Sequence, residues 1–199
     1  MNIASNNKLK KIIFSKNKKY KNLIKRIFEI KAVTKNQNIK LLKINLPPQA
    51  QEQLILKIRN KILDEDILFN PSRKILSTTK NKKCPFCSIY LSTLSNKDSK
   101  RFEGKFWISA DNLFPYDLFH GLFIFRKHKF SKINSEMIKE LIQLAFKWFS
   151  FHQEKNKKLK FYFLGINYLK QAGASLLHPH FHILISPQPY KLSLIHISE

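Results

Sequence analysis

The stretch His178-Pro-His180-Phe-His182 holds three of the seven histidines in this chain of 199 residues. In an extended strand alternate side chains share a face. We therefore expect the three imidazoles to line one surface, while Phe181 and Ile183 enter the core. Imidazole suits phosphoryl or nucleotidyl chemistry near neutral pH as nucleophile, metal ligand or general acid and base. The alternative is a half-polar edge strand that is merely rich in histidine, but three neighbouring imidazoles are hard to satisfy with hydrogen-bond partners by chance.

The composition indicates one basic domain with an extension. Apolar residues make up 43% of the chain, glycine is scarce at 4, and the formal net charge is +24. Clustered Lys and Arg would indicate nucleic-acid binding. Here the lysines are dispersed, which favours a general compositional bias toward Lys, Asn, Ile and Phe and makes nucleic acid an unlikely partner. An anionic substrate such as a nucleotide would still be attracted by this charge.

The cellular setting is predicted from what the sequence lacks. The two cysteines, Cys84 and Cys87, are too close together to act as a general structural staple. The first thirty residues are interrupted by Lys and Asn, unlike a secretory signal. No apolar run reaches the length of a membrane span. We therefore expect a cytoplasmic protein without a membrane partner.

Hydrophobic periodicity predicts helices at residues 20–32, 49–69 and 135–154. The last is the clearest, with Ser135 as the N-cap. Its expected buried stripe consists of Ile138, Leu141, Ile142, Ala145, Trp148 and Phe149. Strands are expected at residues 105–109, 121–126 and 161–166, in addition to the histidine strand.

These elements predict an α+β fold: a twisted antiparallel sheet of about five strands with flanking helices, and helix 135–154 on one face. Residues 1–46 are expected to be a basic N-terminal extension, and residues 47–191 the main domain. Residues 192–199 resemble the translation of a sequencing adapter. We therefore expect the gene to be cut off near Lys191 and this tail to be an artefact.

The pair Cys84-Pro-Phe-Cys87 has two interpretations. A redox dithiol normally opens a helix in a βαβ context, which is missing here. The other interpretation is half of a tetrahedral zinc site, which needs two more ligands. Since the chain has no other cysteine, His or carboxylate side chains must complete the site. His128, at a predicted strand end, and His178 are the candidates.

The loop before the histidines has the features of a phosphate-binding turn. Gly173-Ala-Ser175 precedes His178, and a glycine lets backbone N–H groups approach a phosphate closely. The Ser175 hydroxyl is a possible donor to a phosphate oxygen. Asn167 lies eleven positions before His178. Taken without the histidines, this segment would be an ordinary loop.

The motifs together resemble the histidine-triad superfamily. The stretch from His178 to His182 is similar to the signature of alternating histidines. Gly173-Ala-Ser-Leu-Leu-His-Pro-His180 resembles the galactose-1-phosphate uridylyltransferase branch more closely, as does Cys84-Pro-Phe-Cys87. The turn Asp111-Asn-Leu-Phe-Pro115 is similar to the nucleotide-contacting turn of that branch. Residues 69–73 are weakly similar to segments of related nucleotide phosphorylases.

The resemblance implies a histidine-triad fold and a role for each site residue. His180 would attack the α-phosphate and form a nucleotidyl-histidine intermediate. A structural zinc would be held by Cys84, Cys87, His128 and His178. Phosphate would be bound by Gly173, Ser175, Asn167 and His182, with Ser175 and His182 also counted as catalytic. Ribose and base would be contacted by Asn112 and Phe114.

Two departures from the transferase pattern leave the reaction open. The transferase and phosphorylase branches usually carry Gln where this chain has His182, and the hydrolase branch carries His. The second half found in the uridylyltransferases is absent from this sequence. Nucleotidyl transfer on a nucleotide sugar or related nucleotide diphosphate is the first prediction. The alternatives are a hydrolase that releases a nucleoside monophosphate and a basic nucleic-acid-binding protein with a degenerate triad domain. The superfamily also implies a possible homodimer.

Overall fold

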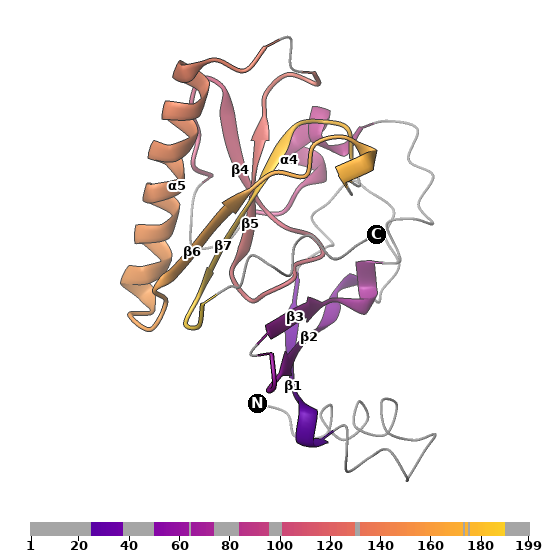
Figure 1. Ribbon diagram of the computed structural model, residues 1–199. Helices are drawn as coiled ribbons and strands as arrows, with labels where there is room; N and C mark the ends of the chain where they lie inside the picture. The colour runs from indigo at the N-terminus through magenta and orange to yellow at the C-terminus, as the bar shows by residue number, and fades with distance from the viewer. Residues whose placement is uncertain are drawn as a thin grey trace.

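The chain folds into two antiparallel sheets and one long helix in the computed structural model (Figure 1). The structure describes residues 25–37, 50–63, 65–73, 84–95, 101–129, 132–172, 174 and 176–189. The predicted adapter tail, residues 192–199, lies outside them. The predicted antiparallel α+β class is confirmed, although the strands divide between a sheet of four and a sheet of three.

The four-stranded sheet carries the histidines. Its strands lie in the order β4, β5, β7, β6, with the bounds Trp107–Asp111, His120–Phe125, His180–Ser186 and Phe161–Gly165. The three strands predicted from periodicity in this region are thus confirmed, with their ends shifted by a few residues. His180 pairs with Ile124, and His182 pairs with Leu122 on one side and Gly165 on the other.

The predicted alternation along β7 is also confirmed. Phe181 and Ile183 belong to the hydrophobic core between the sheet and the long helix, whereas His180 and His182 face the other way. His178 lies just before the strand, and the carbonyl of Pro179 accepts a hydrogen bond from the N–H of Phe125. Proline has no N–H to donate, so it is suited to this position at the strand end.

Helix α5 (Ser135–Lys155) covers one face of this sheet, as Figure 1 shows. Its N-cap is Asn134 rather than the predicted Ser135, because the Asn134 side chain accepts a hydrogen bond from the N–H of Met137. Its buried face consists of Leu141, Leu144, Ala145, Trp148, Phe149 and His152. The prediction was wrong for Ile142, which is 43% exposed because it lies about 100° around the helix from Leu141.

The helix predicted at residues 49–69 is wrong. The segment forms β2 (Glu52–Asn60) and β3 (Glu65–Phe69), which pair with each other. The Asn60 side chain accepts hydrogen bonds from the N–H groups of Ile62 and Leu63, at 3.0 and 3.2 Å, and so stabilises a turn between the strands. The apolar residues of this segment fit a helical spacing, but the turn reverses the chain where a helix would continue.

The helix predicted at residues 20–32 is also wrong over its described part. Residues 25–27 form a single helical turn, and β1 (Phe28–Asn36) follows directly. β1 pairs along its full length with β2, from Phe28 opposite Asn60 to Asn36 opposite Glu52. The apolar residues of this segment fit a helical spacing, but pairing with the distant strand β2 favours the strand conformation. The predicted extension thus supplies one strand of the three-stranded sheet.

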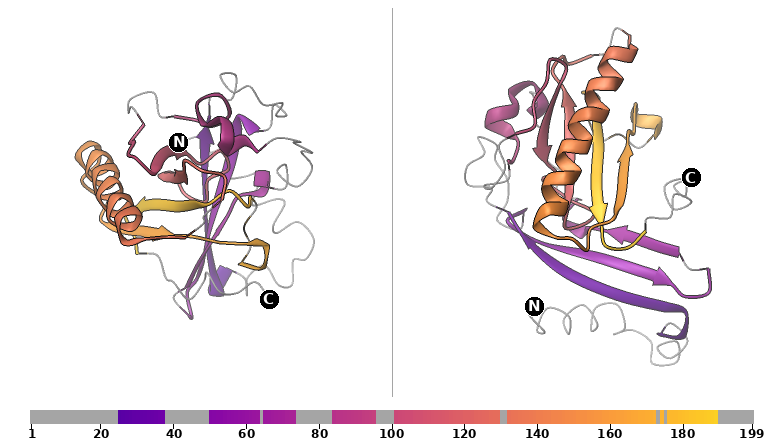
Figure 2. Two further views of the ribbon diagram at one scale, coloured as in Figure 1. Left: turned by 90° about the horizontal axis from the view of Figure 1, so that it is seen from above. Right: turned by 90° about the vertical axis from the view of Figure 1, so that its left-hand side faces the viewer.

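Polar side chains join the three-stranded sheet to the turn of residues 112–118, between β4 and β5. Gln37 and Gln53 donate to the carbonyl of Leu113 at 2.8 and 2.7 Å, and Asn70 donates to the carbonyl of Pro115 at 2.8 Å. Gln53 and Asn70 are 0% and 1% exposed, and they also bond to each other. Figure 2 shows the three strands crossing one end of the four-stranded sheet. This turn is therefore fixed from both sides.

The remaining described elements are short. They are the helical turns η3 (Pro71–Arg73), η4 (Pro85–Ser88), α4 (Ile89–Ser92) and η5 (Lys170–Ala172). Phe86 of η4 packs on β4 and β5, on the sheet face opposite α5. Within the described part of the chain, no helix has both the length and the apolar character needed to cross a membrane.

His152 on the buried face of α5 leads to a prediction of acid sensitivity. Its ring packs on that of Trp148, with ring centroids 4.1 Å apart, and burial lowers the pKa of His152 to about 4. In the unfolded chain His152 binds a proton near pH 6.5, whereas in the folded chain it stays neutral until about pH 4. The free energy of unfolding therefore falls as the pH falls from about 6.5 toward 4. We expect His152→Phe to remove this contribution, about 1.4 kcal/mol per pH unit over that range.

The measurement is urea denaturation of both proteins at several pH values. The difference between the free energies of unfolding of the variant and the wild type should grow in the variant's favour as the pH falls. A constant difference between pH 7 and pH 5 would contradict the assignment.

Candidate active site and metal centre

Four side chains from three segments converge at the end of the sheet where β5 ends and β7 begins. The ligand atoms of Cys84, Cys87, His128 and His178 all lie within 4.8 Å of one another. Cys87 Sγ lies 3.1 Å from His128 Nδ1, and the two cysteine sulfurs lie 3.5 and 3.7 Å from His178 Nδ1. The predicted set of four metal ligands is thus brought together and could hold a metal ion.

The spacing and chemistry of this cluster fit a tetrahedral ion. Metal–sulfur and metal–nitrogen bonds of about 2.3 and 2.1 Å across a tetrahedral angle place S and N about 3.6 Å apart. His178 Nε2 lies 2.6 Å from the carbonyl of Phe125, which can only accept, so Nε2 carries the proton and Nδ1 offers its lone pair to the cluster. Such a bond from the outer nitrogen is the usual support of a metal-binding imidazole.

His180 lies beside the cluster, with its nucleophilic nitrogen defined by the backbone. Its Nδ1 lies 2.8 Å from the carbonyl of His178, so Nδ1 donates a proton there and Nε2 holds the lone pair. Burial is the main cause that lowers the pKa of His180, and the charge of Arg73 lowers it further. The imidazole is therefore neutral at pH 7. Phe86 packs edge-on against it, with ring centroids 5.0 Å apart, and restricts its orientation.

His182 is joined to His120, a residue that the sequence analysis did not single out. His120 Nδ1 accepts a hydrogen bond of 2.9 Å from the N–H of Tyr116, so the proton of neutral His120 is on Nε2. That nitrogen lies 3.0 Å from His182 Nδ1. The amide nitrogen of Asn112, 2.9 Å away, has no lone pair to accept the proton. His120 therefore donates to His182.

This bond determines which tautomer His182 adopts. Because Nδ1 of His182 accepts from His120, its proton is on Nε2 and can be donated into the site. Burial, and then the charges of His180 and Arg73, lower the pKa of His182 to about 3. The pKa of His120 is lowered well below its ordinary value, mainly by burial. Both rings are thus neutral at pH 7, and the site presents one nucleophilic nitrogen and one N–H donor.

The turn that is expected to contact the nucleotide also supports His120 in this structure. Asn112 is buried, and its side-chain oxygen accepts a hydrogen bond of 3.0 Å from the N–H of Phe114. Phe114 is 1% exposed, so its ring belongs to the interior. Their predicted contacts with ribose and base stay predictions.

The predicted phosphate-binding loop is only partly described. Gly173 and Ser175 lie outside the described residues. Asn167 is half-buried, two residues after β6. Gly165 pairs with His182, so the residues after it continue alongside β7 toward His180. The binding role of Asn167 stays a prediction.

Arg73 is a second site residue that the sequence analysis missed. Its guanidinium lies 4.2 Å from the ring centroid of Tyr116 and donates to the carbonyl of Phe114 at 2.9 Å. Its charge contributes to the lowered pKa of His120, His180 and His182. Only the weak motif of residues 69–73 could have indicated it. For His120 the sequence offers only its position, as a histidine at the start of the strand that follows the turn of Asn112.

Comparisons with known proteins give a limited picture. No family model matches the chain. Over 109 residues the chain is 29% identical to an uncharacterized protein from Archaeoglobus fulgidus, a region that is 52% of this chain and 33% of that protein. The chain thus spans about a third of the length of the curated relative that it matches.

Two solved structures are similar to the chain in fold. One is a histidine triad protein from Clostridium difficile, with a TM-score of 0.39 and 18% identity over 54% of this chain and 94% of that one. The other is a HIT family hydrolase from Legionella pneumophila, with a TM-score of 0.40 and 22% identity over 51% and 91% of the two chains. Nearly all of each solved protein is covered, while about half of this chain lies outside the similarity.

The cluster predicts that one metal ion binds per chain and stabilises the fold. Replacing Cys84 with Ser removes a thiolate ligand, so we expect the metal content to fall from about one ion per chain to near zero. The melting temperature should fall with it, because the ion joins the turn η4 to the ends of β5 and β7.

Ser88→Ala is the matched control, since Ser88 ends the same turn and makes no side-chain capping bond. Elemental analysis and thermal denaturation of the three proteins check the prediction. Equal metal content in Cys84→Ser and wild type would show that these residues are not the ligands.

Proposed function

We propose that the chain is a nucleotidyl-transferring enzyme that works through a covalent nucleotidyl intermediate on His180. The observation that supports this most directly is the bond from His180 Nδ1 to the carbonyl of His178, at 2.8 Å. It leaves Nε2 with a lone pair, in a ring that is neutral at pH 7. A neutral imidazole is a competent nucleophile without further activation.

In the first step Nε2 of His180 attacks the α-phosphorus of the nucleotide. The N–P bond forms as the bond from phosphorus to the leaving oxygen breaks, and the leaving oxygen takes the electron pair. The His180 ring becomes cationic, and the carbonyl of His178 stabilises it through the Nδ1–H bond. The N–H of His182 stabilises the negative charge on the leaving oxygen by hydrogen bonding.

In the second step an acceptor oxygen attacks the same phosphorus. The N–P bond breaks and its electron pair returns to Nε2 of His180. An ionised phosphate oxygen as acceptor has no proton to lose, whereas water would release its proton to the solvent. A phosphate-bearing acceptor gives transfer, as the resemblance to galactose-1-phosphate uridylyltransferase implies. The substrate would then be a nucleotide sugar or a related nucleotide diphosphate.

Water as the acceptor gives the second candidate function, hydrolysis to a nucleoside monophosphate. The observation that favours it is His182, an N–H donor at the position where the transferase branch carries Gln. An amide also donates an N–H, so the support for hydrolysis comes from the resemblance to the hydrolase branch, which carries His at this position. Hydrolysis and transfer share the His180 step and differ only in the acceptor.

We further propose that the metal is zinc and that its role is structural. Two thiolates and two imidazoles are a ligand set typical of structural zinc, and four protein ligands leave no position for a reactive water. His178 belongs to this set and also supplies the carbonyl that orients His180. The ion would therefore fix the backbone that positions the nucleophile.

Replacing His180 with Gly should abolish covalent labelling by a radiolabelled nucleoside diphosphate sugar, because the attacking nitrogen is lost. His152→Phe is the matched control, since it removes a buried histidine on the opposite side of the sheet and should retain labelling. Labelling is measured after denaturing gel electrophoresis. Undiminished labelling of His180→Gly would exclude His180 as the nucleophile.

The products distinguish the remaining alternatives. Turnover that requires an added sugar phosphate indicates transfer, and release of a nucleoside monophosphate in its absence indicates hydrolysis. No labelling or turnover, together with RNA binding that weakens steeply with salt, would favour the nucleic-acid-binding alternative.

His120→Leu should lower kcat more than it changes KM, because His182 would lose the bond that holds its proton on Nε2. We expect a decrease in kcat of about 10²-fold, as when one hydrogen-bond donor to a developing oxyanion is lost. A nucleoside p-nitrophenyl phosphate, whose leaving oxygen delocalises its charge into the aromatic ring, should be less affected. Equal losses on both substrates would instead indicate a purely structural role for His120.

A further inference from the structure

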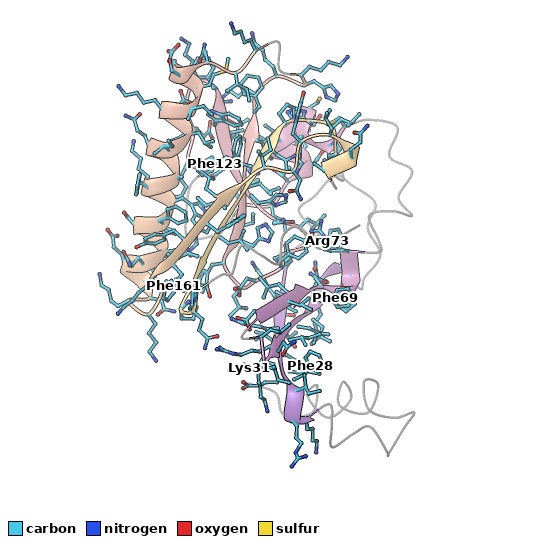
Figure 3. The ribbon with its side chains drawn as sticks, viewed as in Figure 1. Phe28, Lys31, Phe69, Arg73, Phe123 and Phe161 are labelled. Carbon is cyan, nitrogen blue, oxygen red and sulfur yellow. The ribbon has the colours of Figure 1, made fainter. Side chains whose placement is uncertain are left out.

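Arg73 places a positive charge at one end of the histidine row. It belongs to the turn η3, which follows β3 of the three-stranded sheet, yet its guanidinium lies against the turn between β4 and β5. Figure 3 shows the side chain between the two sheets. Arg73 therefore contacts the turn that leads to His120 from a part of the chain that precedes the four-stranded sheet.

The contacts of Arg73 hold it in one orientation. One N–H group donates to the carbonyl of Phe114, and the guanidinium stacks on the ring of Tyr116. The same ring stacks nearly parallel on His120, at 17° and a centroid distance of 5.4 Å. Asn70, three residues earlier, donates to Pro115 and so fixes the segment that carries the arginine. A guanidinium held in this way loses little freedom when it binds an anion.

The charge of Arg73 has no partner of opposite sign among the described residues. The ion pairs recorded there involve other lysines and arginines. The bond to Phe114 uses one of the five N–H donors of a guanidinium. The others can bind two oxygens of a phosphate side by side.

The position of Arg73 along the histidine row indicates which phosphate it would meet. Its guanidinium stacks on Tyr116, Tyr116 contacts His120, and His120 contacts His182, whereas the metal cluster lies beyond His180 at the opposite end. His182 offers the N–H that meets the leaving oxygen. Arg73 is thus on the leaving-group side of the nucleophile.

We propose that Arg73 binds the phosphate of the leaving group, so that the site selects nucleotides whose leaving group is itself phosphorylated. This inference rests on the proposed function, because it presumes attack by His180. The substrate class is a nucleoside diphosphate derivative or a longer polyphosphate. A nucleoside phosphoramidate, with a neutral amine as leaving group, would gain nothing from this cation.

The kinetic test compares wild type, Arg73→Met and Arg73→Lys on a nucleoside diphosphate sugar and on a phosphoramidate of the same nucleoside. With the diphosphate sugar, kcat/KM should fall by about 10²-fold in Arg73→Met, as expected when one partner of a charged pair is removed. Arg73→Lys should recover part of this loss. With the phosphoramidate Arg73→Met should lose much less kcat/KM than with the diphosphate sugar, because this leaving group carries no phosphate, so the ratio of the two losses reports the anion contact. Equal losses on both substrates, or no loss on either, would overturn the proposal.

An equilibrium measurement separates this inference from the proposed reaction. Calorimetry with the nucleoside monophosphate and diphosphate should show a preference of wild type for the diphosphate, and Arg73→Met should lose that preference. Thermal melting establishes that the variant is folded. If wild type is not labelled on His180 but shows an Arg73-dependent preference, the proposed reaction fails and the anion site stands. If wild type is labelled and the preference is unchanged in Arg73→Met, the anion site fails and the reaction stands.

Discussion

The antiparallel pairing of β5 with β7 is the constraint on which the rest of the site depends. In this register His180 lies opposite Ile124 and His182 lies opposite Leu122. The register therefore fixes which face of the sheet carries the imidazoles. A shift of one residue would move every side chain of β7 to the other face and place the histidines in the core. The core under α5, with Phe123 and Ile183 among its buried residues, makes that shift unfavourable. Hydrophobic packing on one face therefore positions the chemistry on the other.

Backbone groups then determine the protonation of each ring. The carbonyl of Phe125 holds the proton of His178 on Nε2, the carbonyl of His178 holds that of His180 on Nδ1, and the N–H of Tyr116 leaves the proton of His120 on Nε2. Histidines with the same side chain thus present different nitrogens. His178 offers a lone pair to the metal cluster, His180 offers a lone pair to the site, and His120 offers an N–H to His182. No difference in side-chain chemistry is needed, because burial keeps the rings neutral and the main chain defines each tautomer.

The three-stranded sheet contributes to the site through buried polar contacts. Gln53, Asn70 and Arg73 bond to three carbonyls of the turn that carries Tyr116 and leads to His120. Buried amides are unfavourable without partners, so these bonds allow few alternative arrangements of the two sheets. The same contacts bring a cation from residue 73 to the histidines. The sheet therefore supports the turn between β4 and β5, and the segment η3 that follows β3 adds the charge of Arg73.

The sequence by itself determined the face of the histidine strand, helix α5 and the four metal-ligand candidates, because these depend on periods of two and 3.6 residues and on ligand chemistry. It did not determine β1, β2 and β3, since their apolar spacing also fits a helix and only pairing between distant segments favours strands. Nor did it identify His120 and Arg73. Each had at most a weak local signal. His120 joins the site through a contact across 62 residues, to His182, and Arg73 through one across 41 residues, to Phe114. The tertiary structure decided their roles. The tautomer of His120 and the orientation of the Arg73 guanidinium depend on neighbours that the chain brings together only when it folds.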